Sequence, residues 1–349
     1  MSKKILFILK RREDYSHTLH THGLSTGLLN SATYVQEMLV KAGIDAVLEV
    51  AIDNNCIDRL VTLHKPDVVI LEALWVVPSK FDILSKLHPT VEWIIRLHSE
   101  MPFMANEGIA MEWMYGYTQY PNVNIGVNAP RMLEEVRKYL MIANKWENGE
   151  ENARVIYMPN YYPIAAKTKK LKKNKYWIDV GCFGAVRPLK NHLVQAIAAI
   201  KFAHRINKQL RFHINAGRIE MKGEPVLHNL QGLFESLNDY GHQLVLHDWM
   251  DREAFIALCA QMDLGMQVSF SETFNIVGAD FISQGVPIVG SSEIPWSSSL
   301  FNADPTSSDD IENALLKAYA VPNLDVDLNA NNLKNYVAKT QAIWVKLLR

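Results

Sequence analysis

The chain lacks several sequence features that are typical of large classes of protein, such as disulfide-rich and strongly basic proteins. Its 349 residues include only three cysteines, Cys56, Cys182 and Cys259, which are scattered and lack the spacing of a metal site. A sparse, odd set of cysteines argues against a disulfide framework and favours a reducing compartment. The formal net charge is -1, so no global field would draw the chain onto nucleic acid or a membrane. Nucleic acid or a membrane would have to bind to a local charged patch of the surface.

Long apolar runs are also missing. The run at 5–9 is too short for a signal peptide, and the longest, at 68–77, is interrupted by Glu72 and is far shorter than a membrane span. Hydrophobic residues make up 48% of the chain and charged residues 21%, which is ordinary for a globular protein. We therefore predict a cytoplasmic protein with no membrane insertion, long enough for two domains. Its oligomeric state stays open.

No Gly-x-Gly-x-x-Gly follows the first strand-like run of either half, which disfavours a dehydrogenase. What is present is a regular alternation of apolar and amphipathic stretches, typical of an α/β protein with doubly wound parallel sheets. The first half has predicted strands at 5–9, 46–52, 67–74, 91–97, 124–127 and 155–158. The second half has them at 177–183, 210–215, 244–247, 264–270 and 286–289.

The predicted domain junction is a lysine-rich stretch. Residues 166–175 hold six lysines and hardly any apolar side chain. We expect a Rossmann-like domain at 1–165, a linker at 166–175 and a second Rossmann-like domain at 176–328. Apolar residues then recur at helical spacing in 329–349, which predicts an amphipathic terminal helix that packs back on the body.

The segment 271–290 reads as turn, helix and strand, and it holds two acids eight residues apart, Glu272 and Asp280. The two would lie on nearly the same face of the helix start, within reach of one ligand. First-turn amides of a helix bind phosphate, and here they would belong to Phe274, Asn275, Ile276 and Val277. This combination suits a sugar joined to a diphosphate. The alternative is an ordinary βαβ unit with a capping glutamate and a solvated aspartate.

A second loop, at 184–191, places Arg187 and Lys190 just before a predicted helix. Both cations would point toward an anion at the carboxyl edge of the sheet, the edge that also carries Glu272. Cations for a diphosphate and carboxylates for sugar hydroxyls are complementary parts of one site. Taken alone, the loop also fits a solvated connection with ordinary charges.

These two stretches resemble a known family. Strand-Gly184-x-x-Arg187-Pro-x-Lys190-Asn-helix, followed by Ser-Glu272-x-Phe-Asn-x-x-x-x-Asp280-x-x-x-x-Gly-Val-Pro-Ile-Val, is similar to the donor-binding domain of GT-B glycosyltransferases. The likeness is in particular to the retaining, glycogen-synthase-like and sucrose-synthase-like group of the family 4 type. It covers about residues 176 to 292. The family motif is Glu, seven residues, Glu, and this chain has Asp280 at the second place.

The resemblance implies roles on the donor side. Glu272 would contact the donor sugar, Asp280 the ribose, and Arg187 with Lys190 the diphosphate. Enzymes with this fold generally need no metal for catalysis, and the chain has no Asp-x-Asp metal motif. We therefore expect no required cofactor, and a nucleoside diphosphate sugar, in the first place a UDP-sugar, as the donor.

Three further residues correspond in position. Trp249 and Met250 match where the family holds the nucleobase, although core packing would explain them equally well. His98 follows a buried strand of the first half and resembles the histidine that meets the donor sugar across the cleft. The alternative for His98 is a purely structural hydrogen bond.

The loop after the first strand is longer than most βα connections, and such loops carry sites. Lys10, Arg11 and Arg12 begin it, and His17 and His20 follow. We expect this loop to shape the acceptor pocket and its cations to favour an anionic acceptor. A metal site built from the loop histidines is a weaker alternative, because no fixed fourth ligand accompanies them.

The leading hypothesis is a retaining glycosyltransferase that transfers a hexose or pentose to an acceptor hydroxyl. The chain looks similar to glycosyltransferases of tailed bacteriophages, some of which modify hydroxymethylated pyrimidines in DNA; the enzyme would then act in the host cytoplasm. The lysines of 166–175 would grip the DNA backbone. A glycan or lipopolysaccharide acceptor is an alternative. So is a two-domain nucleotide-sugar epimerase with Glu100 and Glu107 as further carboxylates, or a module that only binds nucleotide sugars.

Overall fold

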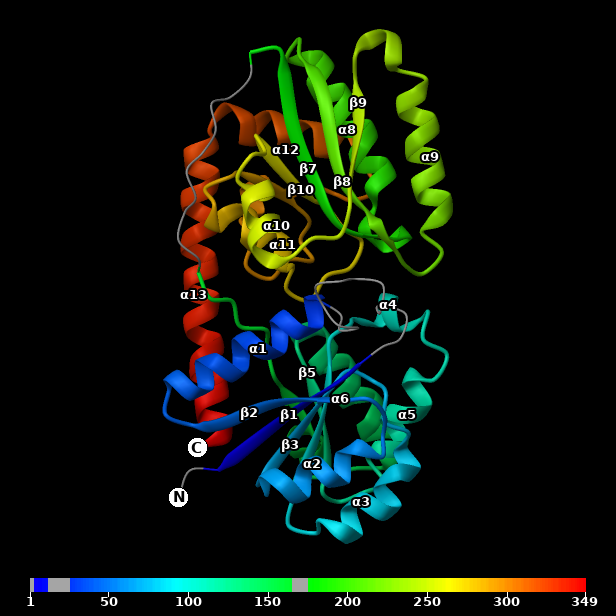
Figure 1. Cartoon of the computed structure of the whole chain (residues 1–349), viewed down its shortest axis with the longest axis vertical. Coiled ribbons are helices and arrows are strands. Elements are labelled where there is room, and N and C mark those ends of the chain that lie inside the picture. Colours follow the sequence, from blue (N-terminus) through cyan, green and yellow to red (C-terminus); the bar gives the residue numbers. More distant parts are fainter. Residues whose placement is uncertain (1–2, 12–25, 165–174) are drawn as a thin grey trace. The chain divides into compact units, whose positions relative to one another are not determined.

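A computed structural model describes residues 3–11, 26–164 and 175–349 of the chain. The chain divides into two compact units, unit 1 (Met1–Pro163 with Val337–Arg349) and unit 2 (Ile164–Tyr336). Each unit has one parallel sheet flanked by helices on both faces (Figure 1). Within the described ranges, no helix has the length and apolar character needed to cross a membrane. Of the predicted linker, only Lys175 is described.

The sheet of unit 1 has six parallel strands in the order β2-β1-β3-β4-β5-β6. The chain moves from β1 to β2 on one side, then continues with β3 on the other side of β1, so the strand order reverses beside β1. The strands are β1 Lys4–Lys10, β2 Asp45–Ala51, β3 Val68–Glu72, β4 Glu92–Leu97, β5 Val123–Val127 and β6 Val155–Tyr157.

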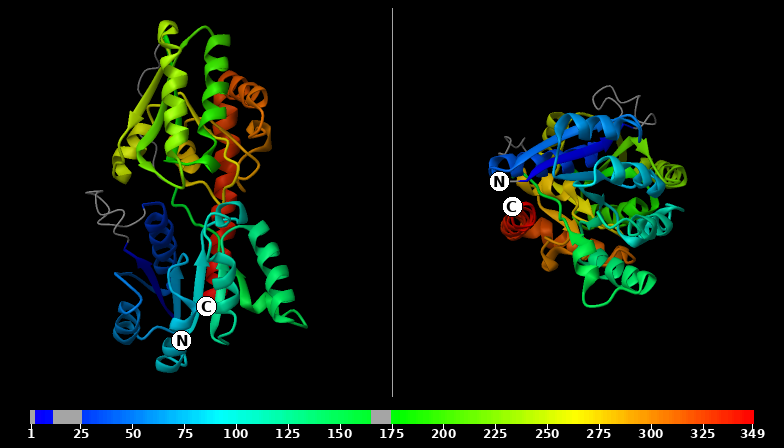
Figure 2. Two further views of the ribbon diagram at one scale, coloured as in Figure 1. Left: turned by 90° about the vertical axis from the view of Figure 1, so that its right-hand side faces the viewer. Right: turned by 90° about the horizontal axis from the view of Figure 1, so that it is seen from below.

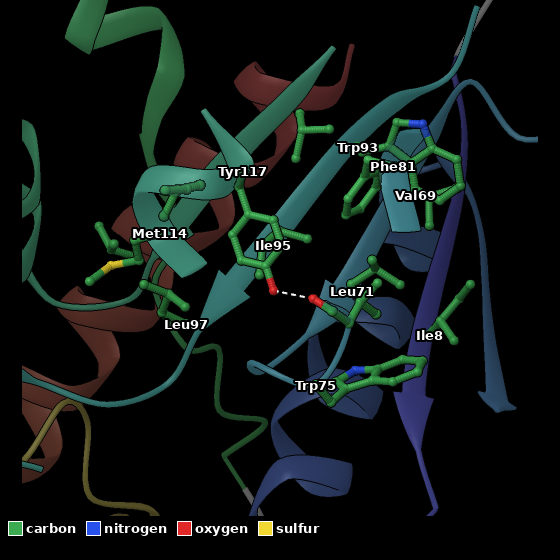
Figure 3. Close-up of a cluster of buried hydrophobic side chains, with 14 of the residues drawn as sticks. Ile8, Val69, Leu71, Trp75, Phe81, Trp93, Ile95, Leu97, Met114 and Tyr117 are labelled. Carbon is green, nitrogen blue, oxygen red and sulfur yellow. Dashed lines mark hydrogen bonds between the residues drawn. The ribbon is translucent and has the colours of Figure 1, made fainter. Parts of the chain in front are cut away.

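Two apolar layers cover this sheet. One face packs against α1 (Thr26–Lys41) and the end of α13 (Pro322–Leu348), where Trp344 and Leu348 are buried. The other face packs against α2 (Cys56–His64), α3 (Phe81–Leu87), α5 (Ala110–Tyr117) and α6 (Pro130–Asn144). Figure 3 shows part of this second layer, in which the ring of Phe81 lies 5.5 Å from that of Trp93, between centroids. The short elements are η2 Pro78–Lys80, α4 Met101–Met104 and α7 Glu150–Arg154.

The sheet of unit 2 has five parallel strands in the order β11-β10-β7-β8-β9, so its strand order reverses beside β7. Helices α8, α9 and α12 cover one face, and α10 and α11 cover the other (Figures 1 and 2). The strands are β7 Trp177–Val186, β8 Gln209–Ile219, β9 Gln243–His247, β10 Leu264–Gln267 and β11 Ile288–Gly290. The helices are α8 His192–Arg205, α9 Glu224–Glu235, α10 Arg252–Cys259, α11 Ile276–Ser283 and α12 Ser308–Ala320.

The expected fold class, two doubly wound parallel sheets, is confirmed. The strand predicted at 264–270 is shorter and ends at Gln267. The reason is that its next backbone donors are used elsewhere: Val268 N–H donates to Gln195 Oε1 and Phe270 N–H to the carbonyl of Leu189. These bonds attach the chain after β10 to the loop after β7.

The terminal helix is longer than the expected 329–349. It begins at Pro322, because proline is tolerated in a first helical turn, where its missing N–H would have no partner. The added turns contain several Asn and Asp residues, whose low helix propensity hid them from the sequence pattern. Its C-terminal end packs back on unit 1, as expected.

Candidate functional site

Lys190 and Glu272 meet at the point where the strand order of unit 2 reverses. Ligands of open parallel sheets bind at such a point, beyond the carboxyl ends of the strands. Here the two neighbouring strands are β7, whose loop carries Lys190, and β10, whose loop carries Glu272. Lys190 Nζ forms a hydrogen-bonded ion pair with Glu272 Oε1, and the two side chains are only 11% and 8% exposed. The sequence prediction that these two loops share one edge holds for this pair.

Two amide side chains fasten the loops to each other. Asn191 has a left-handed backbone (φ 59°), which Asn tolerates better than most residues. Its Nδ2 donates to the carbonyls of Val268 (3.1 Å) and Pro305 (2.7 Å). Gln195 Nε2 donates to the carbonyl of Lys190 at 2.8 Å, while Gln195 Oε1 accepts from Val268 N–H at 2.8 Å. The backbone at Lys190 is therefore held in place by the hydrogen bonds of Asn191 and Gln195.

Helix α11 begins one turn after Glu272. Its N-cap, Asn275, is also left-handed (φ 65°), and Asn275 Oδ1 accepts from Gly278 N–H at 2.6 Å. Asn275 Nδ2 donates to Gln267 Oε1 at 2.9 Å, which ties the cap to the end of β10. The first-turn amides left without an intrahelical acceptor are those of Ile276 and Val277.

The predicted set of four amides is thus too large. Phe274 and Asn275 precede the helix, and Phe274 is buried, with its carbonyl accepting a 2.7 Å hydrogen bond from Trp296 Nε1. The amides of Ile276 and Val277 remain candidates for an N-terminal anion site, and they follow Glu272 by four and five residues in the chain.

Arg187 belongs to a cluster that sequence analysis did not find. Its Nη1 donates to Glu220 Oε2 at 3.2 Å, and Arg218 Nε donates to Glu220 Oε1 at 2.5 Å. The Arg218 guanidinium lies over the ring of Trp249, 5.0 Å from its centroid. Trp249 and Met250 are half-buried. Glu220 thus connects the predicted diphosphate residue to the predicted nucleobase residue.

Arg218 and Glu220 had no clear signal in the sequence. Both lie near the carboxyl end of β8, which extends to Ile219, four residues beyond the predicted end of that strand. The extension pairs out of register with β7, Val186 lying opposite Ile219. An irregular pairing of this kind is not visible in an apolar pattern, so the predicted strand ended before these two charged residues.

Asp280 differs most from expectation. It is fully buried, whereas Glu272 keeps 9% of its surface exposed. Both carboxylate oxygens of Asp280 are bound by Arg252 of α10, with Nη1 2.5 Å from Oδ2 and Nη2 bound to Oδ1. The two acids were expected within reach of one ligand, but α11 presents Asp280 to α10. Arg252, which is partly exposed, was not identified from the sequence.

His98 follows β4 in unit 1 and hydrogen-bonds to Glu72, the last residue of β3, through Nε2. Arg96 Nη1 lies 3.1 Å from Glu72 Oε1. Burial by itself raises the pKa of Glu72, but Arg96 and His98 outweigh it and hold that pKa below its usual value. Burial lowers the pKa of His98, and Arg96 adds to the effect against the opposing pull of Glu72. At neutral pH, Glu72 is therefore an anion and His98 a neutral imidazole.

The remaining predicted residues are less informative. Lys10 is half-buried at the end of β1, and Arg11 is exposed beside it. Arg12, His17 and His20 lie outside the described residues. In the described ranges no three His, Cys, Asp or Glu side chains gather as a metal site would require.

Glu100 and Glu107, the carboxylates of the epimerase alternative, both lie in unit 1. Glu100 is buried and accepts a 2.7 Å hydrogen bond from Arg131 Nε, and Glu107 is half-buried. The first is therefore already committed to an ion pair.

Several solved structures have a fold similar to that of this chain. The catalytic domain of starch synthase IV from Arabidopsis thaliana, bound to ADP and acarbose, superposes with a TM-score of 0.69 at 9% identity, over 99% of both chains. Sucrose-phosphate synthase from Thermosynechococcus elongatus gives 0.67 at 12% identity, over 99% of this chain and 97% of that one. The chain has the GT-B fold. A UDP-forming α,α-trehalose-phosphate synthase from Burkholderia xenovorans shares this GT-B architecture (TM-score 0.64, 12% identity, 99% and 97% covered).

No protein-family model matches the sequence. A search of curated proteins finds no match either. The GT-B assignment therefore rests on the three-dimensional likeness, and the roles of individual residues rest on the geometry described above.

Proposed function

We propose that the chain is a retaining glycosyltransferase that moves a hexose or pentose from a nucleoside diphosphate sugar to an acceptor hydroxyl. The observation that carries this proposal is the Lys190–Glu272 pair at the strand reversal of unit 2, directly before the N-terminus of α11. The GT-B neighbours support it, since one was solved with ADP and another is named as UDP-forming. We favour a UDP-sugar as donor and propose that no metal is required.

In the proposed donor site, the cationic groups and the carboxylate bind different parts of the donor. Arg187, Lys190 and the amides of Ile276 and Val277 would bind the diphosphate, which gains negative charge as it leaves the sugar. Glu272 would accept hydrogen bonds from sugar hydroxyls and, before the donor binds, holds Lys190 in place. The sugar passes through a transition state with oxocarbenium character, which a nearby carboxylate stabilises.

The outer parts of the donor have their own proposed partners. Trp249 and Met250 would hold the nucleobase, and His98 of unit 1 would contact the sugar. Asp280 would reach the ribose only together with Arg252, because the arginine covers both of its oxygens. In this chain we therefore propose that the ribose is contacted by the Arg252–Asp280 pair, not by Asp280 alone.

For the acceptor we favour a hydroxymethylated pyrimidine of phage DNA. Lys10 and Arg11 at the end of β1 offer cations to an anionic acceptor. Binding to DNA through such residues would weaken steeply as salt is raised. A glycan or lipopolysaccharide is the alternative acceptor and would use the same donor site.

Donor use is tested with the purified chain and a panel of UDP- and ADP-sugars, with release of the free nucleotide measured by mass spectrometry. We expect turnover of at least one donor, its loss in Glu272→Gln, and no loss in the control Glu235→Gln, an exposed residue at the end of α9. No binding or turnover of any nucleotide sugar, or full activity in Glu272→Gln, would contradict the proposal.

Acceptor and stereochemistry are tested with the donor found in that panel. Hydroxymethylcytosine DNA and a lipopolysaccharide fraction are offered in parallel, and the products are analysed as nucleosides or glycans by mass spectrometry and NMR. Glycosylated nucleoside with the anomeric configuration of the donor is expected. An inverted product would overturn the retaining mechanism, and free epimerised sugar from donor alone would point to the epimerase.

A further inference from the structure

The support of His98 is a buried ion pair that the sequence pattern did not reveal. Glu72 and Arg96 are both 0% exposed in the sheet of unit 1. Arg96 Nη1 lies 3.1 Å and 3.3 Å from the two oxygens of Glu72. Burying two charges is costly unless each is paired and its remaining hydrogen-bonding groups are satisfied.

The remaining donors of Arg96 are indeed satisfied. Its Nε donates to the carbonyl of Met158 at 3.2 Å, and its Nη2 donates to Asn160 Oδ1 at 2.7 Å and to the carbonyl of Pro159 at 3.3 Å. Asn160 Oδ1 also accepts from the hydroxyl of Ser31 at 2.7 Å. The guanidinium is therefore fixed in one orientation, and with it the carboxylate of Glu72.

The backbone beside Glu72 adopts a costly conformation. Ala73 has a left-handed backbone (φ 71°), which an alanine adopts only at a cost of about 1 kcal/mol or more. Ala73 N–H donates to the carbonyl of Arg96 at 2.9 Å, so the turn is tied to β4. Local strain of this kind persists where the surrounding structure enforces it, and such places cluster at functional sites.

We propose that Glu72 is a positioning residue for His98, which it holds in the tautomer protonated at Nε2. The argument uses the donor and acceptor chemistry of the two side chains. An ionised carboxylate only accepts hydrogen bonds, so the ring atom bound to it, Nε2, must carry the proton. In a neutral ring the lone pair is then on Nδ1.

Arg96 affects both Glu72 and His98. It keeps Glu72 ionised, and it also cancels the charge that would otherwise draw a second proton onto His98. Under the proposed function, the donor sugar would therefore meet a neutral imidazole of fixed orientation rather than a mobile cation. The inference depends on that function only in giving His98 a sugar to contact.

The tautomer is tested by NMR on the full chain labelled with ¹⁵N-histidine. The His98 signals are assigned by their loss in His98→Gln. We expect the pattern of a neutral ring protonated at Nε2 at pH 7, and a mixture of tautomers in Glu72→Gln. The control Glu92→Gln removes a carboxylate from the start of β4, the strand that His98 follows, and should leave the His98 signals unchanged. An Nδ1-protonated or cationic His98 in the unaltered chain would overturn the proposal, and this needs no variant to fold.

A kinetic arm applies with the donor identified for the proposed function. Glu72→Gln is expected to lower kcat by about 10²-fold, the scale of a misplaced reacting group, with little change in KM. Glu72→Asp keeps the charge and should recover part of the loss. Unchanged kcat in a folded Glu72→Gln would contradict the positioning role. If no donor is turned over at all, the proposed function fails while the NMR result still decides the tautomer.

Discussion

At the scale of single residues, the charge of Lys190 is central to the proposed donor site. In Lys190→Met the cation is lost and Glu272 stays nearly buried without its partner, so a diphosphate would approach an unpaired carboxylate. We expect the affinity for UDP to fall at least about tenfold, or about 1.4 kcal/mol. Isothermal titration calorimetry measures this. The control Lys317→Met, an exposed lysine of α12, should bind UDP as the unaltered chain does, and equal affinity in both variants would refute the assignment.

Glu220 allows a second test of the same site, because it touches no proposed part of the donor. It holds both Arg187 and Arg218, and Arg218 lies over Trp249. Glu220→Gln should weaken the ion pairs of both arginines and lower UDP affinity by about tenfold, in line with the loss of a hydrogen bond to a charged group. Tryptophan fluorescence during the titration would report the changed surroundings of Trp249. An unaltered titration curve would mean that the cluster is only structural.

Among the elements, α13 and β11 are joined by a buried carboxyl group. Asp325 of α13 accepts a 3.0 Å hydrogen bond from Ile288 N–H at the start of β11, and burial raises the pKa of Asp325 to about 7. The folded pKa exceeds the unfolded value, so the contribution of Asp325 to stability is greatest at low pH and falls as pH rises from about 4 to about 7.

Asp325→Asn keeps the acceptor oxygen and removes the charge. The variant should therefore melt roughly 3 °C or more above the unaltered chain at pH 8, with a smaller gain at pH 5. Differential scanning calorimetry at both pH values checks this. The control Asp327→Asn, an exposed residue of the same helix, should show no such difference. A gain that does not depend on pH would show that Asp325 is ionised in the folded chain at pH 5 as well as at pH 8.

The start of α8 contains a histidine with the opposite dependence on pH. His192 is 1% exposed, and its ring nitrogens have no hydrogen-bond partner among the described residues. Burial, aided by Lys190 and Arg187, lowers its pKa to about 3. Because the unfolded chain binds a proton at this histidine more readily, the contribution of His192 to stability is fully present above pH 6.5 and is lost as pH decreases toward 3.

Replacing this side chain should therefore make the protein more tolerant of acid. Between pH 7 and pH 5, the melting temperature of His192→Leu is expected to decrease by less than that of the unaltered chain. His228→Gln, at an exposed position of α9, serves as the control and should follow the unaltered chain. If His192→Leu shows the full acid-induced decrease, His192 does not remain neutral in the fold.

Elements were predictable to the extent that their signal is local. Buried parallel strands are short apolar runs, so β1 and β4 were found within a residue or two. The turn residues Asn191 and Asn275 follow the site residues in sequence and mark both loops. In contrast, the Arg252–Asp280 and Arg96–Glu72 pairs join residues that are 28 and 24 positions apart. No periodicity encodes such pairs, because packing of one element on another creates them.

For the molecule as a whole, the same arrangement recurs in both units. Each sheet reverses its strand order beside its first strand, and in each unit candidate residues lie at the carboxyl ends of the strands next to that reversal: Glu72 in unit 1, and Lys190 with Glu272 in unit 2. A doubly wound sheet offers its binding edge at that place for reasons of topology alone. The recurrence explains how two weakly marked halves of one chain each carry candidate site residues.

Helix α13 connects the two units covalently and makes a different buried contact in each. In unit 1 its Trp344 is fully buried, donates a 2.8 Å hydrogen bond to the carbonyl of Pro159 and lies under the guanidinium of Arg96, 5.0 Å from the ring centroid. Trp344→Ala should destabilise unit 1 by about 3 to 5 kcal/mol. Because Arg96 fixes Glu72, the same change should loosen the support of His98.

Hydrogen exchange followed by mass spectrometry separates the two units in this experiment. In Trp344→Ala the amides of β3 and β4 should exchange faster, while those of β7 and β8 keep their protection, since the lost contacts all belong to unit 1. Lys346→Ala, at an exposed position of the same helix, is the matched control. Equal acceleration in both sheets would mean that the units unfold as one body, and α13 would then transmit the loss of Trp344 to unit 2.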